Sequence, residues 1–368
     1  MGRFLIVSAS MGAGHDTVAA ELATRLRAGG HRTAHADLLD LLPAGTGHGL
    51  RTAYRAALQH CPWAYQALYE AFFRDHRTPG RRGRLPDTGP LAALIAPRLR
   101  RIVDQWHPDA LVSTFHQAAQ AAGRLRAAHP AACPPSTVVI TDFAVHRQWL
   151  HPGNDLYLCL TDSAAIHIRS AIGRPAQVCG PLVPAAFTAS RRDAPGQAPS
   201  PWVRELARYG PGRPAVLISA GAWGVGQGLA ATALLLADAG YVPVLLCGRS
   251  ERLRARTAGL PGVLSLDWTT DLPGLMAASS ALIDNAAGQT AIQALAAGVP
   301  VIGYRPIPGH GIDGVRAMAD AHITERATNP RTLLTALDRL AHPGPYREER
   351  IGVARNLFTT DPTQYLAR

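Results

Sequence analysis

Short apolar runs alternate with longer stretches of helical periodicity along this chain of 368 residues. Residues 4–9 form a nearly continuous apolar run, after which Val18, Leu22 and Leu26 recur every four residues. A run of this length is typical of a strand buried on both faces, and the four-residue spacing predicts a helix with one buried stripe. The alternation therefore predicts parallel α/β units, in which helices connect the strands of one sheet.

This pattern occurs twice, on either side of a segment without periodicity. Further runs of strand length lie at residues 110–113, 137–141 and 156–160, and then at 215–220, 242–248, 263–266, 281–285 and 299–304. Residues 191–201 are rich in Pro and polar residues and have the composition of a linker. We predict a Rossmann-like N-terminal domain at residues 1–190, a second Rossmann-like domain at 202–344, and a polar, helical tail at 345–368.

The fold class we expect is therefore α/β, with two parallel sheets facing each other across a cleft. Two domains suit the length, because domains typically have about 50–250 residues. Ligands of such folds bind at the carboxyl ends of the strands and between domains. Residues directly after the predicted strands are thus the first candidates for a functional site.

The chain is strongly basic, with a net charge of +11, and all 37 basic residues are Arg because it contains no Lys. This composition is typical of a GC-rich coding sequence; the alternative is a selected basic surface for an anionic partner. The densest basic cluster consists of Arg74, Arg77, Arg81, Arg82 and Arg84. No aromatic interleaving or nucleic-acid motif accompanies it, so nucleic acid is not an expected partner.

Cysteine usage and hydropathy predict a cytoplasmic protein. The five cysteines are scattered and form no C-x-x-C pair, which is typical of free thiols in a reducing compartment. No run of 18 apolar residues occurs, since the best candidate, residues 234–247, is interrupted by Asp238, Gly240 and Pro243. The apolar N-terminus is too short for a signal peptide and leads into a glycine turn.

The turn after the first predicted strand, residues 10–15 (SMGAGH), is the first candidate site. Glycines let the backbone approach a ligand closely, and the helix N-terminus that follows suits an anion or a developing negative charge. The pattern is not G-x-G-x-x-G, so a dinucleotide site is poorly supported. His15 lies at the start of the helix, where it is either catalytic or a residue that only caps or packs the turn.

Polar side chains also follow the later strands of the first half. Asp142 and His146 come at the end of one predicted strand, His116 follows another, and Trp149 lies nearby. The carboxylate and the imidazoles could orient a substrate hydroxyl or act in proton transfer. Each residue alone is more commonly structural, whereas convergence of these strand ends would indicate a site.

The second half contains two further glycine turns, at residues 221–226 (GAWGVG) and 285–290 (NAAGQT). In the latter, Gln289 and Thr290 stand at a helix N-terminus, where a diphosphate leaving group would be stabilised. The alternative is an ordinary helix whose free amides Thr290 caps. Residues 306–314 form a loop of the kind that lines a cleft. The chain has no D-x-D pair, Walker loop or metal-ligand spacing, so no metal or cofactor is expected.

Together these segments resemble, in order, the monogalactosyldiacylglycerol synthase and processive diacylglycerol glycosyltransferase group, which is related to glycosyltransferase family 28. MGAGHDTVAAEL is similar to the glycine-rich opening of the family, and DLLDLLP, TDFAVHRQWLHPGND and CGPLVPAAF follow in its order. VLISAGAWGVG, LLCGRSERL and WTTDLPGLMAASSALIDNAAGQTAIQALAAGVPVIGYRPIPG resemble its donor half. The resemblance runs from about Phe4 to Gly314.

The resemblance implies a GT-B fold and an inverting, metal-independent glycosyltransferase, in which a base removes the acceptor proton. It implies that His15 and Asp142 are catalytic. The positions it implies for acceptor binding are Gly14, His116, His146 and Trp149. The positions it implies for donor binding are Gly221, Trp223, Gly224, Arg249, Trp268, Thr269, Gly288, Gln289, Thr290, Gln293 and His310.

Three of these donor positions depart from the pattern of the family. Trp223 stands where the second turn of the family carries an acid. Gln293 stands where an acid holds the ribose hydroxyls, and a neutral amide lacks the charge that strengthens such a contact. His310 and Gly311 replace a Gln-Glu pair. The departures concern the donor, so the sequence leaves open which nucleotide sugar is bound.

The sequence thus predicts a glycosyltransferase that uses a nucleotide sugar, with UDP as the expected nucleotide, as its co-substrate. The acceptor is a diacylglycerol-type lipid or a soluble secondary metabolite. For a lipid, the aromatic segment 63–73 and the basic cluster after it would rest on an anionic membrane surface. Two alternatives stay open: a nucleotide-sugar 2-epimerase, which needs no acceptor, and a non-catalytic nucleotide-sugar binding protein, which the missing acids favour.

Overall fold

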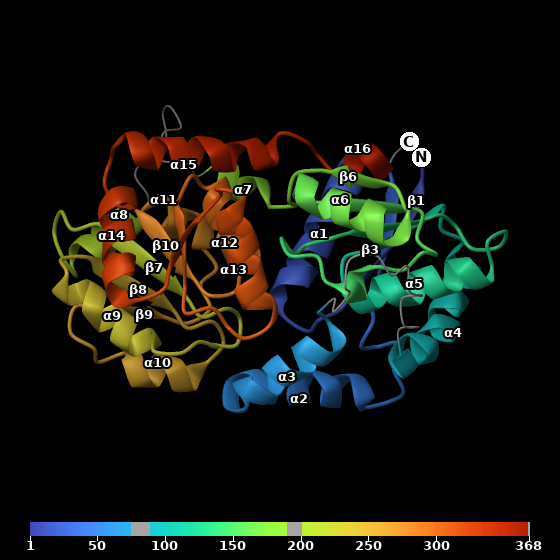
Figure 1. The fold of residues 1–368 in the computed structure, drawn as a ribbon, viewed down its shortest axis with the longest axis horizontal. Helices are drawn as coiled ribbons and strands as arrows, with labels where there is room; N and C mark the ends of the chain where they lie inside the picture. The colour runs from blue at the N-terminus through green and yellow to red at the C-terminus, as the bar shows by residue number, and fades with distance from the viewer. Residues whose placement is uncertain (75–88, 190–200, 367–368) are drawn as a thin grey trace. The chain divides into compact units, whose positions relative to one another are not determined.

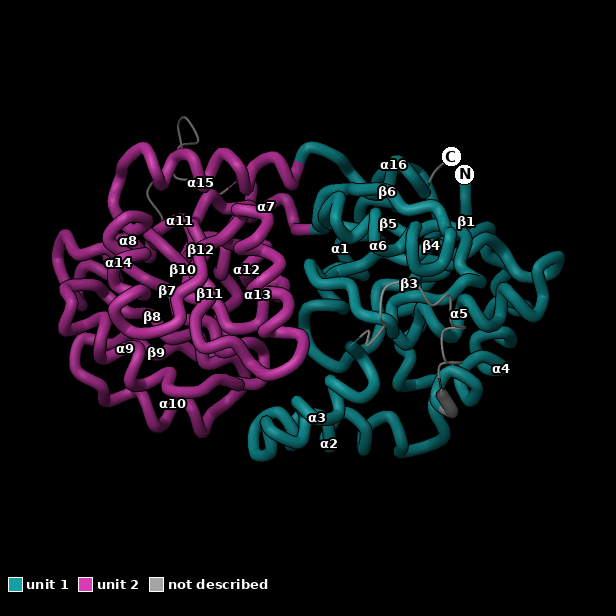
Figure 2. Tube along the Cα trace, viewed as in Figure 1, with its two compact units in different colours: residues 1–182, 359–368 teal, residues 183–358 magenta. Residues whose placement is uncertain are grey.

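The chain forms two compact units, each built on a six-stranded parallel sheet (Figures 1 and 2). The structure is a computed structural model that describes residues 1–74, 89–189 and 201–366. Unit 1 contains Met1–Leu182 and Thr359–Arg368, and unit 2 contains Val183–Phe358. The prediction of two Rossmann-like α/β domains is confirmed. Residues 191–200 of the predicted linker and most of the arginine cluster, from Arg77 to Arg84, lie outside the described residues, whereas Pro201 begins α8.

Unit 1 has the strand order β2-β1-β3-β4-β5-β6, with every pair parallel. Its strands are β1 (Arg3–Ser8), β2 (Arg32–Asp37), β3 (Ala110–Ser113), β4 (Ser136–Val139), β5 (Leu156–Cys159) and β6 (Ala176–Val178). Its helices are α1 (Ala13–Ala28), α2 (Thr46–His60), α3 (Pro62–Phe72), α4 (Gly89–Trp106), α5 (His116–Ala128), α6 (Asp162–Ile172) and α16 (Thr363–Leu366). The order reverses at β1 and β3, and open α/β sheets commonly bind ligands outside the carboxyl ends of the strands at such a point.

Unit 2 has the strand order β12-β11-β10-β7-β8-β9, again with every pair parallel. Its strands are β7 (Ala215–Ser219), β8 (Val242–Leu246), β9 (Leu264–Leu266), β10 (Ala281–Asp284), β11 (Val301–Tyr304) and β12 (Glu325–Ala327). Its helices are α7 (Ala185–Ala189), α8 (Pro201–Ala207), α9 (Leu229–Asp238), α10 (Glu251–Thr257), α11 (Leu272–Ala277), α12 (Gln289–Ala296), α13 (His310–Asp320), α14 (Pro330–Leu340) and α15 (Pro345–Arg355). This is the order of a dinucleotide-binding sheet, with its reversal at β7 and β10.

The predicted strands all occur, because their residues are buried on both faces of the sheets. Leu5, Ile6 and Val7 are inaccessible to solvent, and Val18, Leu22 and Leu26 pack from α1 onto one face of the sheet. The sequence analysis missed three strands: β2, β6 and β12. All three lie at sheet edges and are partly exposed. An edge strand needs no continuous apolar run, so hydropathy does not reveal it.

The C-terminal segment divides between the two units. Helix α15 belongs to unit 2, whereas Thr359–Arg368 returns to unit 1. There Asp361 accepts a hydrogen bond from Arg25 at 3.1 Å, and Leu366 joins the cluster that includes Leu22 and Leu26. The described part of the predicted tail, residues 345–366, is mostly helical, but its last helix, α16, is part of the first unit. No helix in the described ranges is both long enough and apolar enough to cross a membrane.

Candidate active site

Unit 1 places a group of polar and aromatic side chains at the carboxyl ends of β1, β3 and β4. These three strands are neighbours in the sheet, and β1 and β3 flank the point where the strand order reverses. His15 lies in the first turn of α1, and Gly14 precedes it. His116 begins α5 after β3, while Asp142 follows β4. The topology therefore brings residues more than 100 positions apart to one edge of the sheet.

The His15 imidazole is held by the main chain of a neighbouring strand end. Its Nδ1 lies 3.0 Å from the carbonyl oxygen of Thr114 and 3.3 Å from the Oγ1 of Thr141. A carbonyl oxygen only accepts hydrogen bonds, so Nδ1 must carry the proton in this contact. The neutral ring then has its lone pair on Nε2. No hydrogen bond to Nε2 is found among the described residues. His15 is thus in the tautomer of a general base.

Asp142 is anchored to the same cluster. Its Oδ2 accepts a hydrogen bond from the indole Nε1 of Trp149 at 2.8 Å, and the Nε2 of His146 lies 3.7 Å from the same oxygen. The Thr141 hydroxyl is 3.5 Å from Oδ1. Since Thr141 also approaches His15, one hydroxyl stands between the carboxylate and the imidazole. Asp142 is therefore placed to orient the aromatic and imidazole groups around it.

Aromatic contacts connect the predicted residues into one cluster. The rings of His116 and His146 meet edge-on with centroids 5.1 Å apart, and Trp149 lies 5.9 Å from His116 and 6.4 Å from His15. Trp149 is fully buried. The structure thus brings together His15, Asp142, His116, His146 and Trp149, which the sequence had placed only at separate strand ends.

Several residues of this cluster were missed by the sequence analysis. Thr114 acts through its backbone carbonyl, which carries no side-chain signal. Thr141 directly precedes Asp142 and could have been found as a polar strand end. Asp16, next to His15, accepts a hydrogen bond from the Ser8 hydroxyl at 3.2 Å. Burial raises the pKa of Asp16, although the Ser8 hydrogen bond acts to lower it.

Unit 2 has one glycine turn at the carboxyl end of β7 and another at that of β8. Gly224 and Gly248 have φ of 66° and 61°, which favours glycine. The Arg249 amide donates to the carbonyl oxygen of Ala222 at 2.9 Å, so the two turns are joined by the main chain. The guanidinium of Arg249 lies 4.4 Å from the ring centroid of Trp268, a residue that is 45% exposed. A positive group on an aromatic ring is thereby presented at this edge.

We expect Gly248→Ala to destabilise unit 2 by about 2–4 kcal/mol, because both the backbone and the space require glycine. A Cβ atom at Gly248 would lie 2.2 Å from the carbonyl oxygen of Gly221, and its φ is positive. Urea unfolding would measure the loss. The matched control is Gly352→Ala in α15, where a Cβ would meet no atom of the described residues within 4 Å. Equal stability of the two variants would contradict the prediction.

The turn between β10 and α12 is fixed by hydrogen bonds to Asp284, and the space next to its Gly288 is open. The Asp284 carboxylate accepts the amides of Ala286 and Ala287 at 2.9 and 2.6 Å. Burial raises the pKa of Asp284, although these amide hydrogen bonds act to lower it. Gly288 is the N-cap residue of α12, and in the described part of the chain it has no side-chain cap hydrogen bond. A Cβ at Gly288 would meet no described atom within 4 Å.

The remaining predicted donor residues lie on the same edge of unit 2. Thr269 comes after β9 next to Trp268, and His310 begins α13 after β11. Gln289, Thr290 and Gln293 lie on α12. Trp223 and Gly221 belong to the turn after β7. All of them therefore follow strands of one sheet at its carboxyl end.

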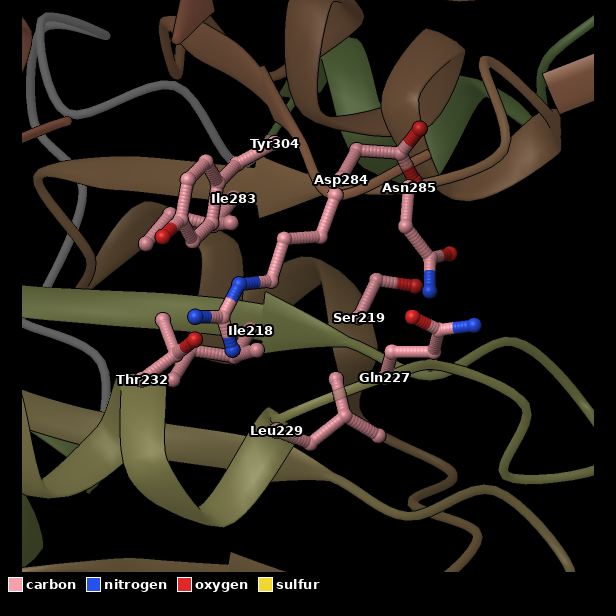
Figure 3. A pocket seen from close by; sticks show the side chains of 10 residues that line it. Ile218, Ser219, Gln227, Leu229, Thr232, Ile283, Asp284, Asn285 and Tyr304 are labelled. Atoms are coloured by element: carbon pink, nitrogen blue, oxygen red, sulfur yellow. The ribbon is translucent and has the colours of Figure 1, made fainter. Parts of the chain in front are cut away.

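A small pocket lies beside these residues, at the reversal between β7 and β10 (Figure 3). The pocket is shallow and partly open to solvent. Its lining residues are Ile218, Ser219, Gln227, Leu229, Thr232, Ile283, Asp284, Asn285, Tyr304 and Arg305. None of the predicted donor residues lines it. Asn285 connects the pocket to the glycine turn, because its side-chain amide donates to the carbonyl oxygen of Val225 at 2.9 Å.

Comparison with known proteins confirms the resemblance. Residues 15–181 match the family model for monogalactosyldiacylglycerol (MGDG) synthase. The processive diacylglycerol beta-glucosyltransferase of Bacillus subtilis is 27% identical over 220 residues, which cover 58% of this chain and 55% of that protein. The chain thus matches little more than half the length of this curated relative.

Solved structures support the fold over the whole chain. The glycosyltransferase SnogD from Streptomyces nogalater has a TM-score of 0.60 at 19% identity, covering 100% of this chain and 97% of that one. Anabaena HepE, solved in complex with UDP and glucose, has a TM-score of 0.55 at 14% identity, covering 97% and 94%. At these identities the likeness establishes the fold alone, and the predicted GT-B fold class is confirmed.

Proposed function

We propose that this chain is a glycosyltransferase that moves a sugar from a nucleotide-sugar donor onto an acceptor hydroxyl. The observation that carries the proposal is the state of His15. Its Nδ1 is bound to the Thr114 carbonyl, which leaves the Nε2 lone pair available in the first turn of a helix, and the Thr141 hydroxyl that approaches the same ring also approaches Asp142. This is the arrangement that a base for an acceptor hydroxyl requires. The similarity to diacylglycerol glucosyltransferases supports the same reaction.

The proposed reaction is a direct displacement that inverts the anomeric carbon. The acceptor oxygen forms a bond to that carbon while the bond to the diphosphate oxygen breaks, and Nε2 of His15 takes the acceptor proton. The imidazolium that forms keeps its Nδ1–H bond to the Thr114 carbonyl, whose partial negative charge stabilises it. Asp142 supplies a full negative charge across the Thr141 hydroxyl. No metal ion is needed for these steps.

We assign the donor to unit 2, with UDP as the proposed nucleotide. The N-terminus of α12 offers main-chain N–H groups and the positive end of the helix dipole to the diphosphate. Gly288 leaves the space in front of it open. Arg249, held over Trp268, adds a positive charge for the leaving group, as oxyanion stabilisation requires.

We expect Gln293→Glu to strengthen UDP binding by about tenfold, because an ionised acceptor of the ribose hydroxyls makes a stronger hydrogen bond than an amide. Gln293 is 9% exposed, so the same change should destabilise the unliganded protein by burying a charge. Calorimetry with UDP and thermal unfolding would measure the two effects. An unchanged affinity would show that the ribose is held elsewhere.

The acceptor we propose is a diacylglycerol-type lipid in an anionic membrane, which the enzyme meets as a peripheral protein on the cytoplasmic face. Helices α2 and α3 lie next to each other in unit 1 (Figure 1). Both expose large apolar side chains. These are Leu50, Trp63, Leu68 and Phe72, with exposures of 37%, 75%, 48% and 56%. Exposed apolar side chains of this size suit insertion into a membrane interface.

The test uses UDP-glucose with dioleoylglycerol in phosphatidylglycerol vesicles, with EDTA present to remove metal ions. We expect release of UDP and formation of a glucosyl lipid. Epimerised sugar formed without acceptor would indicate a nucleotide-sugar 2-epimerase. UDP binding without turnover on lipids or on soluble aglycones would indicate a binding protein. Transfer to soluble aglycones alone would favour the secondary-metabolite version.

Vesicle sedimentation tests the membrane part separately. We expect the protein to sediment with anionic vesicles and to be released by salt, since polybasic attraction is screened. Trp63→Asp should lower the bound fraction, because a charge would replace the most exposed of the large apolar side chains on α2 and α3. The control is Ile166→Asp on α6, which is 60% exposed but lies on a different helix. If both variants lose the same fraction of vesicle binding, α3 is not the membrane-binding helix.

A further inference from the structure

The C-terminal end of α3 is hydrogen-bonded to the turn that follows His146. Together with His15 and His116, His146 forms what we call the histidine cluster. The Arg147 guanidinium donates to the carbonyl oxygens of Ala71 and Phe72, and the Gln148 amide donates to Phe72 at 2.9 Å. The Arg147 backbone amide reaches the Phe73 carbonyl at 3.2 Å. The last carbonyls of a helix lack partners within the helix, and a cation there complements the helix dipole. We call these four hydrogen bonds the Arg147 clamp.

The Arg147 clamp binds the chain between two residues of the candidate active site, His146 and Trp149. Arg147 and Gln148 belong to the 3-10 turn Arg147–Trp149, directly after His146. Residues on either side of the donors, His146 and Trp149, are therefore those that contact Asp142. A shift of α3 against this turn would have to break hydrogen bonds or displace the turn with it.

The residues at the end of α3 have two different environments. Phe72 is 56% exposed and lies one turn beyond Leu68, which is 48% exposed. The Phe73 ring packs edge-on against His116 and His146, with centroids 5.3 and 5.0 Å apart, and stacks on Tyr69 at 5.4 Å. One helix end thus presents apolar side chains to the outside and an aromatic ring to the histidines.

We propose that Arg147 is a positioning residue that keeps the apolar face of α3 in register with the histidine cluster, so that a long-chain lipid held on α3 presents its hydroxyl to His15. This rests on the proposed function and adds a basis for acceptor selectivity. A short-chain acceptor can reach the cluster without α3. Loss of the clamp should therefore lower activity on the long-chain acceptor only, whereas general damage to the fold would lower activity on both acceptors.

The kinetic test compares Arg147→Met with the wild type on dioleoylglycerol in vesicles and on water-soluble dihexanoylglycerol. Methionine keeps the apolar stem and removes every guanidinium hydrogen bond. We expect KM for dioleoylglycerol to rise by at least about tenfold, with kcat and the dihexanoylglycerol parameters within about twofold, because charged hydrogen bonds are lost only at the α3 contact. Arg147→Lys should recover part of the loss. An equal loss on both acceptors would overturn the proposal.

Arg213→Met is the matched control. The Arg213 guanidinium donates to the carbonyls of Ala237 and Gly240 at the C-terminal end of α9 in unit 2. It removes the same kind of contact from a helix that carries none of the acceptor residues. We expect a similar stability loss with no change in the preference for the long-chain acceptor. A change in that preference would show that the effect of Arg147 is not specific.

Hydrogen exchange tests the coupling without turnover. Anionic vesicles should slow exchange in both residues 62–74 and residues 142–149 of the wild type, but only in residues 62–74 of Arg147→Met. Protection confined to α3 in the wild type would overturn the proposal. If the wild type transfers sugar to neither diacylglycerol, the proposed function fails, while this exchange result still decides whether the clamp connects the two segments.

Discussion

Replacing His15 with alanine is expected to lower kcat by at least about a hundredfold, because general-base catalysis contributes about 10²–10⁴ to the rate. The variant loses the Nε2 lone pair that we assign to the acceptor proton. It also loses the Nδ1 contact to Thr114, which sets the tautomer. Initial rates of UDP release with saturating acceptor would measure the loss. UDP binding should stay within about twofold, since His15 belongs to unit 1 and the donor is assigned to unit 2.

Two variants make the His15 result specific. His129→Ala removes an exposed imidazole at the end of α5 and should leave kcat unchanged. Thr141→Val removes the hydroxyl between His15 and Asp142 but leaves the Thr114 contact, so its loss should be smaller. Near-normal turnover of His15→Ala would remove His15 from the role of base and would leave the acceptor site without its central residue.

Replacing Gly288 with leucine is expected to weaken UDP binding by at least about a hundredfold, because it fills the place where we put the diphosphate and keeps it from the α12 amides. The native backbone tolerates a side chain, since φ is −96° and a Cβ would meet no described atom within 4 Å. The protein should therefore stay folded. Thermal unfolding with and without UDP measures both properties, because a bound ligand raises stability by mass action.

Gly259→Leu is the control for the Gly288 experiment. Gly259 follows α10, and in the part of the chain that the structure describes a Cβ there would also meet no atom within 4 Å. The control should keep both its melting temperature and its stabilisation by UDP. If Gly288→Leu is stabilised by UDP as strongly as the wild type, the nucleotide does not bind at this helix end. The pocket of Figure 3 would then be the next candidate for the nucleotide site, since Asn285 connects it to the same turn.

Local sequence signals placed the candidate residues correctly at the carboxyl ends of strands, because buried strands are recognisable from their apolar runs. Hydropathy identified β1, β3 and β4, so the residues after them were candidates without a structure. Hydropathy failed at β2, β6 and β12, where edge position removes the need for an apolar run. The proposed roles of the donor residues stay predictions, because residues at the carboxyl edge of such a sheet can bind many kinds of ligand.

The sequence by itself determined that two parallel α/β units exist and that glycine turns follow their first strands, because burial and backbone freedom act over a few neighbouring residues. It could not determine the state of His15, since the carbonyl that sets its tautomer belongs to Thr114, 99 positions later. Nor could it reveal that Arg147 binds the end of α3, 75 positions earlier. Such contacts depend on how strands are ordered in the sheet, and only the tertiary structure decides which distant carbonyl meets which donor.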